Sequence, residues 1–186
     1  MSEPKFTVRI DCRRFRGDTP CAPSALCEGC EKYEPMGKRI LIIKLGALGD
    51  VLRTTPILPE LRREHAPCHI TWIVEEQSAP LLRNNPHIDR LVVYGPEAIV
   101  RAMTERFDVV FSFDKHAGAA GLAAMARAGK KIGFTLDEAT GNISYTAESA
   151  EYAYRLGLDD ALKFRENVYT YQQMIFEMLG LPWRGH

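Results

Sequence analysis

A repeating alternation of short β-branched runs with helical patterns constrains the fold of this chain most strongly. The first run, residues 39–44, is a continuous Ile- and Leu-rich segment, typical of a strand buried on both faces of a parallel sheet. Further strands are expected at residues 69–74, 88–94, 107–113 and 131–134. Helices are expected between them at residues 50–63, 77–83, 96–105 and 117–128, and after them at 167–179. This order predicts an α/β fold with a Rossmann-like, doubly wound and mostly parallel sheet.

Prolines, glycines and polar stretches mark where these elements end. Pro56 and Pro59 are expected to kink or split the helix at residues 50–63. Residues 136–147 are polar and are expected to form a loop, and Gly180 is expected to cap the last helix. We therefore assign residues 37–186 to the Rossmann-like domain and residues 1–36 to a separate Cys-rich extension.

Composition excludes several classes of protein. With 186 residues, the chain holds one domain and a small appendage, at roughly 150 residues per domain. Its 24 basic and 24 acidic residues give a formal net charge of zero, so we expect no nucleic-acid partner. No apolar run reaches the ~20 residues that span a bilayer, and the first ten residues do not resemble a signal peptide. We therefore predict a cytoplasmic protein without a transmembrane segment.

Four of the five cysteines lie in the first thirty residues: Cys12, Cys21, Cys27 and Cys30. A thiol cluster in a protein without a secretory signal indicates metal ligation rather than disulfides. The two-residue gap between Cys27 and Cys30 turns both sulfurs toward one ion. We predict a structural zinc site, while an iron–sulfur cluster or unligated, redox-active thiols remain alternatives. Cys68 is expected to be a buried, inert core residue.

The turn at residues 44–51 is the first candidate ligand site. Ligands of open α/β sheets bind outside the carboxyl ends of the strands, and this turn follows the first strand. Gly46 and Gly49 allow the backbone to approach a ligand closely. Asp50 is expected either to cap the following helix or to present a carboxylate to the cleft, where it can accept a proton.

Two more strand ends carry polar residues, and one familiar motif is incomplete. We expect Glu75 and Glu76 to be solvated, Asp114 to cap a helix and His116 to be exposed, although the last two can also reach the cleft. A dinucleotide site requires G-x-G-x-x-G, and the first turn retains only a pair of glycines three residues apart. A dinucleotide-dependent oxidoreductase is therefore the weakest of the alternatives.

Several separated motifs occur between residues 38 and 182. The first strand ends in Lys44, and a small-residue turn leads to Gly49-Asp50-Val51 and then to Thr54-Thr55-Pro56. The other motifs are residues 70–75, 79–82, 85–89, 107–110, 113–115 and 132–134. In this order the motifs resemble those of the family 9 glycosyltransferases, the heptosyltransferases of lipopolysaccharide core synthesis. Some relatives also carry a Cys-rich N-terminal extension, matched here by residues 11–13 and 27–30.

The resemblance implies a GT-B fold, in which two Rossmann-like domains face each other across a cleft. It implies inverting transfer of heptose from ADP-heptose to a lipopolysaccharide core sugar, or to a related glycan or lipid-linked acceptor, without a catalytic metal. Asp50 is then the general base that removes the proton from the acceptor hydroxyl. The expected acceptor-binding residues are Lys44, Gly46, Gly49, Arg53 and Asp114.

Two of these residues have a more specific expected role. Lys44 and Arg53 are expected to pair with acidic acceptor groups such as the carboxylates of Kdo, or else to form surface salt bridges. Gly46 and Ala47 stand where hydroxyl residues are common in the family, which leaves the identity of the acceptor open.

The chain ends where the second domain of the family would begin, and that domain holds most of the donor site. We therefore expect this chain to supply the N-terminal, acceptor-side half and to be inactive alone. The expected location is the cytoplasm, with peripheral contact to the inner face of the inner membrane. The main alternative is a non-catalytic assembly module whose zinc knuckle docks a partner protein.

Overall fold

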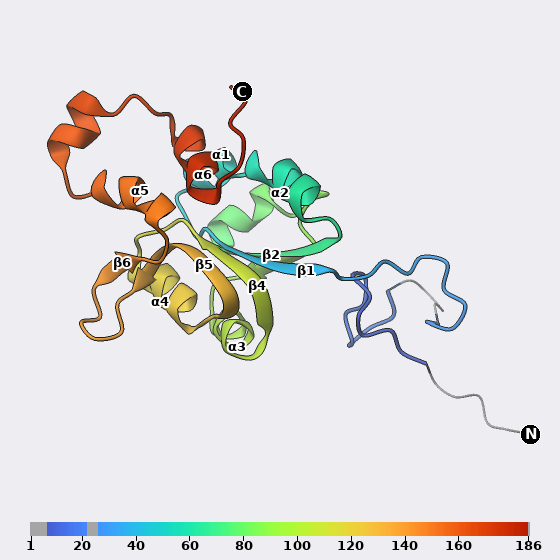
Figure 1. Ribbon diagram of the computed structural model, residues 1–186. Coiled ribbons are helices and arrows are strands. Elements are labelled where there is room, and N and C mark those ends of the chain that lie inside the picture. The colour runs from blue at the N-terminus through green and yellow to red at the C-terminus, as the bar shows by residue number, and fades with distance from the viewer. Residues whose placement is uncertain (1–6, 22–25, 186) are drawn as a thin grey trace, which may run out of the picture.

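The computed structural model describes residues 7–21 and 26–185. In these residues, six strands form one sheet in the order β3-β2-β1-β4-β5-β6 (Figure 1). The strands are β1 (Lys38–Ile43), β2 (Cys68–Val74), β3 (Arg90–Val93), β4 (Arg106–Ser112), β5 (Arg127–Leu136) and β6 (Ile143–Tyr145). The first five pair in parallel, and β6 pairs antiparallel with β5. The predicted α/β fold with a mostly parallel sheet is confirmed.

Helices cover both faces of the sheet. The helices are α1 (Leu48–Thr54), α2 (Ile57–His65), α3 (Pro96–Thr104), α4 (Ala117–Met125), α5 (Glu151–Arg155) and α6 (Tyr171–Leu179). Short helical turns occur at η1 (Glu76–Leu81), η2 (Glu148–Ala150) and η3 (Leu162–Glu166). The expected helix at residues 50–63 is split as predicted: Pro56 lies between α1 and α2, and proline has no N–H for the helical ladder.

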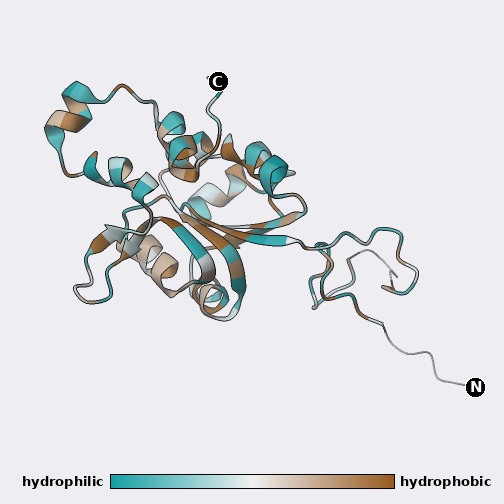
Figure 2. Ribbon diagram, viewed as in Figure 1, coloured by the Kyte–Doolittle hydropathy of each residue, from teal (hydrophilic) through white to brown (hydrophobic). Residues whose placement is uncertain are grey.

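Two apolar layers hold these helices against the sheet. Along β1, Ile40 and Ile42 face the layer shared with α1, α2 and α6, whereas Leu41 and Ile43 face the layer shared with α3 and α4. All four side chains are fully buried, as the two-residue period of a strand covered on both faces requires. Figure 2 shows hydrophobic residues concentrated on the central strands and mostly hydrophilic residues along α2.

The C-terminal third differs most from expectation. The predicted loop at residues 136–147 contains β6, whose three residues are too few to show an alternating pattern. Helix α6 begins at Tyr171 rather than near residue 167, because the Thr170 side chain caps it by accepting a hydrogen bond from the Gln173 N–H at 3.2 Å. Gly180 caps its other end with a left-handed φ of 68°, as predicted.

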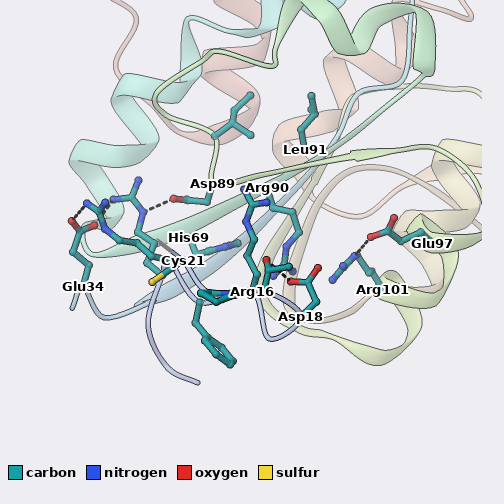
Figure 3. Close-up of a pocket in the computed structure, with 16 residues that line it drawn as sticks. Arg16, Asp18, Cys21, Glu34, His69, Asp89, Arg90, Leu91, Glu97 and Arg101 are labelled. Carbon is teal, nitrogen blue, oxygen red and sulfur yellow. Dashed lines mark hydrogen bonds and ion pairs between the residues drawn. The ribbon is translucent and has the colours of Figure 1, made fainter. Parts of the chain in front are cut away.

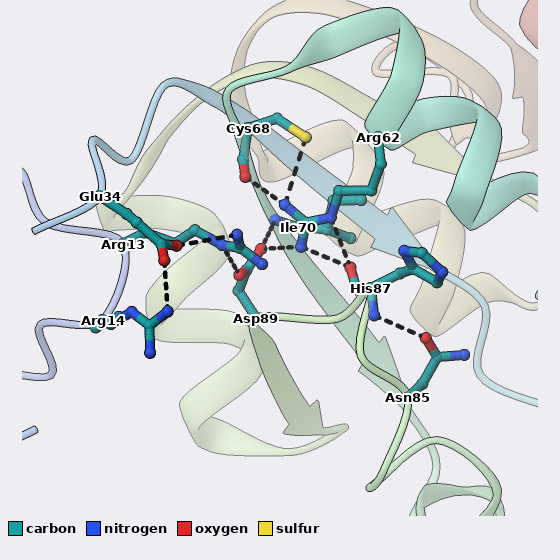
Figure 4. Close-up of polar contacts among 9 residues, drawn as sticks. All are labelled: Arg13, Arg14, Glu34, Arg62, Cys68, Ile70, Asn85, His87 and Asp89. Carbon is teal, nitrogen blue, oxygen red and sulfur yellow. Dashed lines mark hydrogen bonds and ion pairs between the residues drawn. The ribbon is translucent and has the colours of Figure 1, made fainter. Parts of the chain in front are cut away.

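The N-terminal extension contains no helix or strand in its described residues, and it meets the sheet at the amino ends of the strands (Figure 1). Its anchor is Asp89, whose side chain is only 5% exposed. This carboxylate forms ion pairs with Arg13 of the extension and Arg62 of α2, and it accepts a hydrogen bond from the Ile70 N–H at 2.7 Å (Figure 4). The extension is thus attached through a buried charge cluster rather than through an apolar core.

Candidate functional site

The strand order creates a crevice at the carboxyl ends of β1 and β4. These strands are neighbours in the sheet, but their following helices, α1 and α4, pack on opposite faces. Where the helices after two neighbouring strands lie on opposite faces of the sheet, a crevice forms between the strand ends, and open α/β sheets bind ligands there. Lys44 directly follows β1 and Asp114 lies two residues beyond β4, so the pairing of the strands brings the two side chains together.

Lys44 and Asp114 form a buried ion pair in this crevice. The Lys44 side chain is 3% exposed, and its ammonium group also donates a hydrogen bond to the Gly46 carbonyl. Asp114 Oδ2 accepts a hydrogen bond from the Leu45 N–H at 2.5 Å. The surface salt bridge considered for Lys44 is therefore wrong, and so is the helix cap expected at Asp114. The cap of α4 is the exposed His116, whose Nδ1 accepts a hydrogen bond from the Gly118 N–H at 3.2 Å.

Asp50 lies beside this pair with its side chain 34% exposed. It does not cap α1, as one reading of the sequence expected, because the helix starts early enough for Ala47 to occupy the cap position and for Asp50 to lie in the first turn. Asp50 Oδ1 forms an ion pair with Arg53, while Oδ2 is 3.9 Å from Lys44 Nζ, beyond hydrogen-bond distance. One carboxylate oxygen therefore remains open to a ligand.

These residues border a cavity of about 370 Å³. Lys44, Asp50 and Asp114 line it, as the sequence predicted, whereas Gly46, Gly49 and Arg53 are not among its described lining residues. The Arg53 guanidinium instead lies over the Tyr171 ring, 4.6 Å from its centroid. The structure thus brings three of the six predicted site residues to one cavity, while the role of each stays a prediction.

Part of the cavity lining comes from the C-terminal segment, which sequence analysis did not assign to the site. Lys163 of η3 and Tyr171 of α6 line the cavity. The Tyr171 hydroxyl lies 3.2 Å from Thr54 Oγ1, and burial raises the pKa of Tyr171 to about 12, so the phenol remains neutral. No sequence motif marks either residue, because the packing of α6 on α1 creates their proximity to Asp50.

The charge of the cavity favours acidic ligands. Three lysines, Lys44, Lys115 and Lys163, line it together with two carboxylates, Asp50 and Asp114. Lys115 donates to the carbonyls of residues 153 and 154, both at 2.8 Å, and burial lowers its pKa. Lys115 lies within the motif at residues 113–115, which is the one sequence signal that points to it.

A second, larger cavity of about 950 Å³ lies at the other end of the sheet, between the extension and the amino ends of β2 and β3 (Figure 3). It is lined mainly by charged residues, many of them in ion pairs such as Arg13 with Glu34 and Arg101 with Glu97. His69 is buried at its edge, and the pKa of His69 is lowered to about 4, mainly by burial. None of the residues predicted for the sugar site lines this cavity.

The four clustered cysteines line a third cavity, of about 480 Å³, within the extension. Among the described residues, no three His, Cys, Asp or Glu side chains are grouped closely enough to hold a metal ion. The zinc site therefore stays a prediction. Cys68 is buried as predicted, and burial raises the pKa of its thiol.

Within the described part of the chain, every helix is too short or too polar to cross a membrane.

Comparisons with known proteins show that this chain is similar to one group of enzymes. No protein-family model matches the chain. Over 53 residues, 28% of the chain, it is 36% identical to lipopolysaccharide heptosyltransferase 1 of Campylobacter coli, and the match covers 16% of that enzyme. A family 9 glycosyl transferase of Veillonella parvula is 29% identical, with 50% of this chain and 30% of that chain covered and a TM-score of 0.45.

The E. coli heptosyltransferase WaaC, solved with ADP, is 18% identical, with 77% of this chain and 48% of WaaC covered and a TM-score of 0.47. The chain thus spans about half the length of WaaC and less of the other two relatives. The similarity to the heptosyltransferases, first indicated by the motifs around Asp50, is confirmed by the sequence match to lipopolysaccharide heptosyltransferase 1.

Proposed function

We propose that this chain is the acceptor-binding half of a family 9 glycosyltransferase with a GT-B fold. The observation that carries the proposal is the position of Asp50, a partly exposed carboxylate at the edge of a cavity at the switch point of the sheet. The sequence similarity to a heptosyltransferase supports the reaction type, inverting transfer of a sugar from a nucleotide sugar such as ADP-heptose.

Asp50 is proposed as the general base. An acceptor hydroxyl about 3 Å from Asp50 Oδ2 gives its proton to that oxygen as the hydroxyl oxygen attacks the anomeric carbon of the donor. The new glycosidic bond forms on the face opposite to the breaking bond, and ADP leaves with the electron pair of that bond. The ion pair with Arg53 engages Oδ1 and leaves Oδ2, 3.9 Å from Lys44 Nζ, as the oxygen proposed to take the proton.

The lysines are proposed to select an acidic acceptor. Lys115 and Lys163 line the cavity together with Asp50, and the lining lysines outnumber the lining carboxylates by one. A sugar that carries a carboxylate, as in the lipopolysaccharide inner core, would gain charge-assisted hydrogen bonds from them. Part of this gain is offset because Lys115 already donates to two backbone carbonyls.

The donor is proposed to bind mainly to a second Rossmann-like domain that faces this cavity. The negative charge on the departing ADP then requires cations or a helix N-terminus from that domain, and no catalytic metal is expected. WaaC, which has been solved with ADP and with an ADP-2-deoxy-2-fluoro heptose, gives the precedent for such a donor. Action in the cytoplasm, at the inner face of the membrane, is part of this proposal.

The test is Asp50→Asn in a protein that contains this chain together with a donor domain. We expect turnover to fall about 10²–10⁴-fold, because amide nitrogen and oxygen cannot take up the proton, while the thermal midpoint stays nearly unchanged. Glu97→Gln is the matched control, since Glu97 is an exposed residue of α3 outside the cavity, and its turnover should equal that of the wild type. Wild-type turnover in Asp50→Asn would remove Asp50 as the base.

A further inference from the structure

All four cysteines of the N-terminal extension line one cavity of about 480 Å³. None is in a disulfide; Cys12 is buried, Cys27 and Cys30 are half-buried, and Cys21 is exposed. Four unpaired thiols around a shared space are the ligand set of a tetrahedral zinc site and of an iron–sulfur cluster alike.

Backbone contacts bring the two ends of the extension together. Cys12 forms an isolated antiparallel bridge with Pro35, flanked by hydrogen bonds from the Arg13 N–H to the Glu34 carbonyl and from the Met36 N–H to the Asp11 carbonyl, both at 2.8 Å. This places the first cysteine beside the segment that follows the last one.

A tight turn orients the C-terminal pair of cysteines. The Cys30 N–H lies 3.4 Å from the Cys27 carbonyl, and Gly29 takes the left-handed φ of 67° that the turn needs. Both residues of the pair therefore face the cavity from one loop.

The charge around the cavity suits a thiolate-bound metal. Arg9, Arg14 and Lys32 line it with a single carboxylate residue, Glu31. Four thiolates around Zn²⁺, or around a cluster core of charge 2+, carry a net charge of about 2−. Arg9 and Arg14 also pair with Asp11 and Glu34, so these cations offset only part of that charge.

The extension has almost no other source of folding free energy. Of its described residues before Lys38, only Cys12 is buried, and the apolar side chains Ile10 and Leu26 are 74% and 70% exposed. A segment of this size needs a staple, and a metal centre supplies one because its binding free energy becomes folding free energy.

We propose that Cys12, Cys21, Cys27 and Cys30 together ligate one metal centre, a zinc ion or an iron–sulfur cluster, that holds the extension in its folded form. Among the described residues no ready-made ligand group exists, so the thiols close on the metal as they release their protons. Cys21, Cys27 and Cys30 lie outside regular structure, whereas Cys12 is held by its bridge with Pro35.

The proposed centre also controls how the extension docks. Arg13 directly follows Cys12 in sequence and reaches the buried carboxylate of Asp89 (Figure 4). Loss of the metal would release the extension around Cys12 and with it one wall of the 950 Å³ cavity shown in Figure 3. The centre therefore has a structural consequence that can be measured without any transferase assay.

The experiment measures metal, acid-labile sulfide and visible absorption in the full protein purified without oxygen. About one zinc per chain, or about two or four irons with matching sulfide and visible absorption, supports the proposal and identifies the centre. Absence of both from the wild type would overturn it. Each of the variants Cys12→Ser, Cys21→Ser, Cys27→Ser and Cys30→Ser should lose most of the metal, and full occupancy in any of them would overturn the four-ligand assignment.

Cys68→Ser is the matched control, because Cys68 is a buried thiol of β2 outside the cavity and should leave the metal content unchanged. Hydrogen exchange separates loss of metal from loss of fold. After chelation, amides of residues 7–36 should exchange faster while those of β1 and β2 keep their protection. Unchanged exchange in the extension would contradict its dependence on the metal.

Discussion

Replacement of Lys44 by Met tests the buried ion pair that joins the ends of β1 and β4. Lys44→Met conserves most of the side-chain volume but leaves the Asp114 carboxylate without its cation in a site where the lysine side chain is 3% exposed. An uncompensated buried charge costs about 3–5 kcal/mol. We expect the lower end, about 3 kcal/mol, because Asp114 keeps the hydrogen bond from the Leu45 N–H.

Urea unfolding measures this cost. Trp72 is a suitable probe because its fully buried indole N–H donates to the Lys44 carbonyl at 3.1 Å. For a chain of this length, 3 kcal/mol corresponds to a fall in thermal midpoint of about 6–12 °C. The matched control is Arg53→Met, which breaks the more exposed pair with Asp50 and should cost about 1 kcal/mol or less.

A double variant separates charge from packing. Asp114→Asn in the Lys44→Met background removes the unpaired charge while an amide oxygen still accepts from the Leu45 N–H. We expect the double variant to be more stable than Lys44→Met alone, with a coupling of about 2 kcal/mol between the sites. Additive effects, or a cost for Lys44→Met no larger than that of Arg53→Met, would refute the reasoning.

Two further predictions concern stability. Burial lowers the pKa of His69 to about 4, so the unfolded chain binds a proton below pH about 6.5 that the folded chain takes up only near pH 4. The contribution of neutral His69 to the free energy of unfolding is therefore complete above pH about 6.5 and falls by about 2 kcal/mol between pH 7 and pH 5. Urea unfolding of His69→Gln at the two pH values should lack this difference. The same pH dependence in the variant and the wild type would exclude His69 as its source. Gly133→Ala should destabilise by about 3 kcal/mol, because φ is 114° and an added Cβ would lie 1.9 Å from the Ser112 carbonyl oxygen. Gly141→Ala, at a φ of 71° in open space, is its control and should cost about 1 kcal/mol in the same thermal denaturation, so equal losses would contradict the clash.

The parallel strands β1, β2 and β4 could be predicted because each is a β-branched or aromatic run long enough to recognise. Strand β5 (Arg127–Leu136) was predicted only over residues 131–134, because its first half consists of Arg, Ala, Gly and Lys. The run at residues 39–44 and its successors account for β1, β2 and β4 with shifts of one residue at their ends. Strand β6 could not be predicted, since its three residues gain their strand conformation from pairing with β5. The local sequence pattern cannot predict a strand whose conformation depends on hydrogen bonds to a partner strand.

The candidate site was predictable only along the first half of the chain. The rule that ligands bind at carboxyl ends of strands points to Lys44, Asp50 and Asp114, and the cavity contains all three. The cap of α1 was misassigned to Asp50 because α1 starts at Leu48 and takes Gly49 into the helix instead of the turn. Lys163 and Tyr171 depend on the packing of the C-terminal segment, which leaves no local trace in the sequence.

Strand length sets the separation between the two ends of the domain. Strand β1 has six residues, and at about 3.3 Å per residue it spans about 20 Å from the Cys-rich extension to the turn before Asp50. At that distance a change in charge at the cysteine thiols changes the electrostatic potential at the Asp50 carboxylate only weakly, since salt screens surface charges over about 10 Å. Mutations at one end are thus expected to leave the other unaffected, which allows the two ends to diverge independently among related proteins.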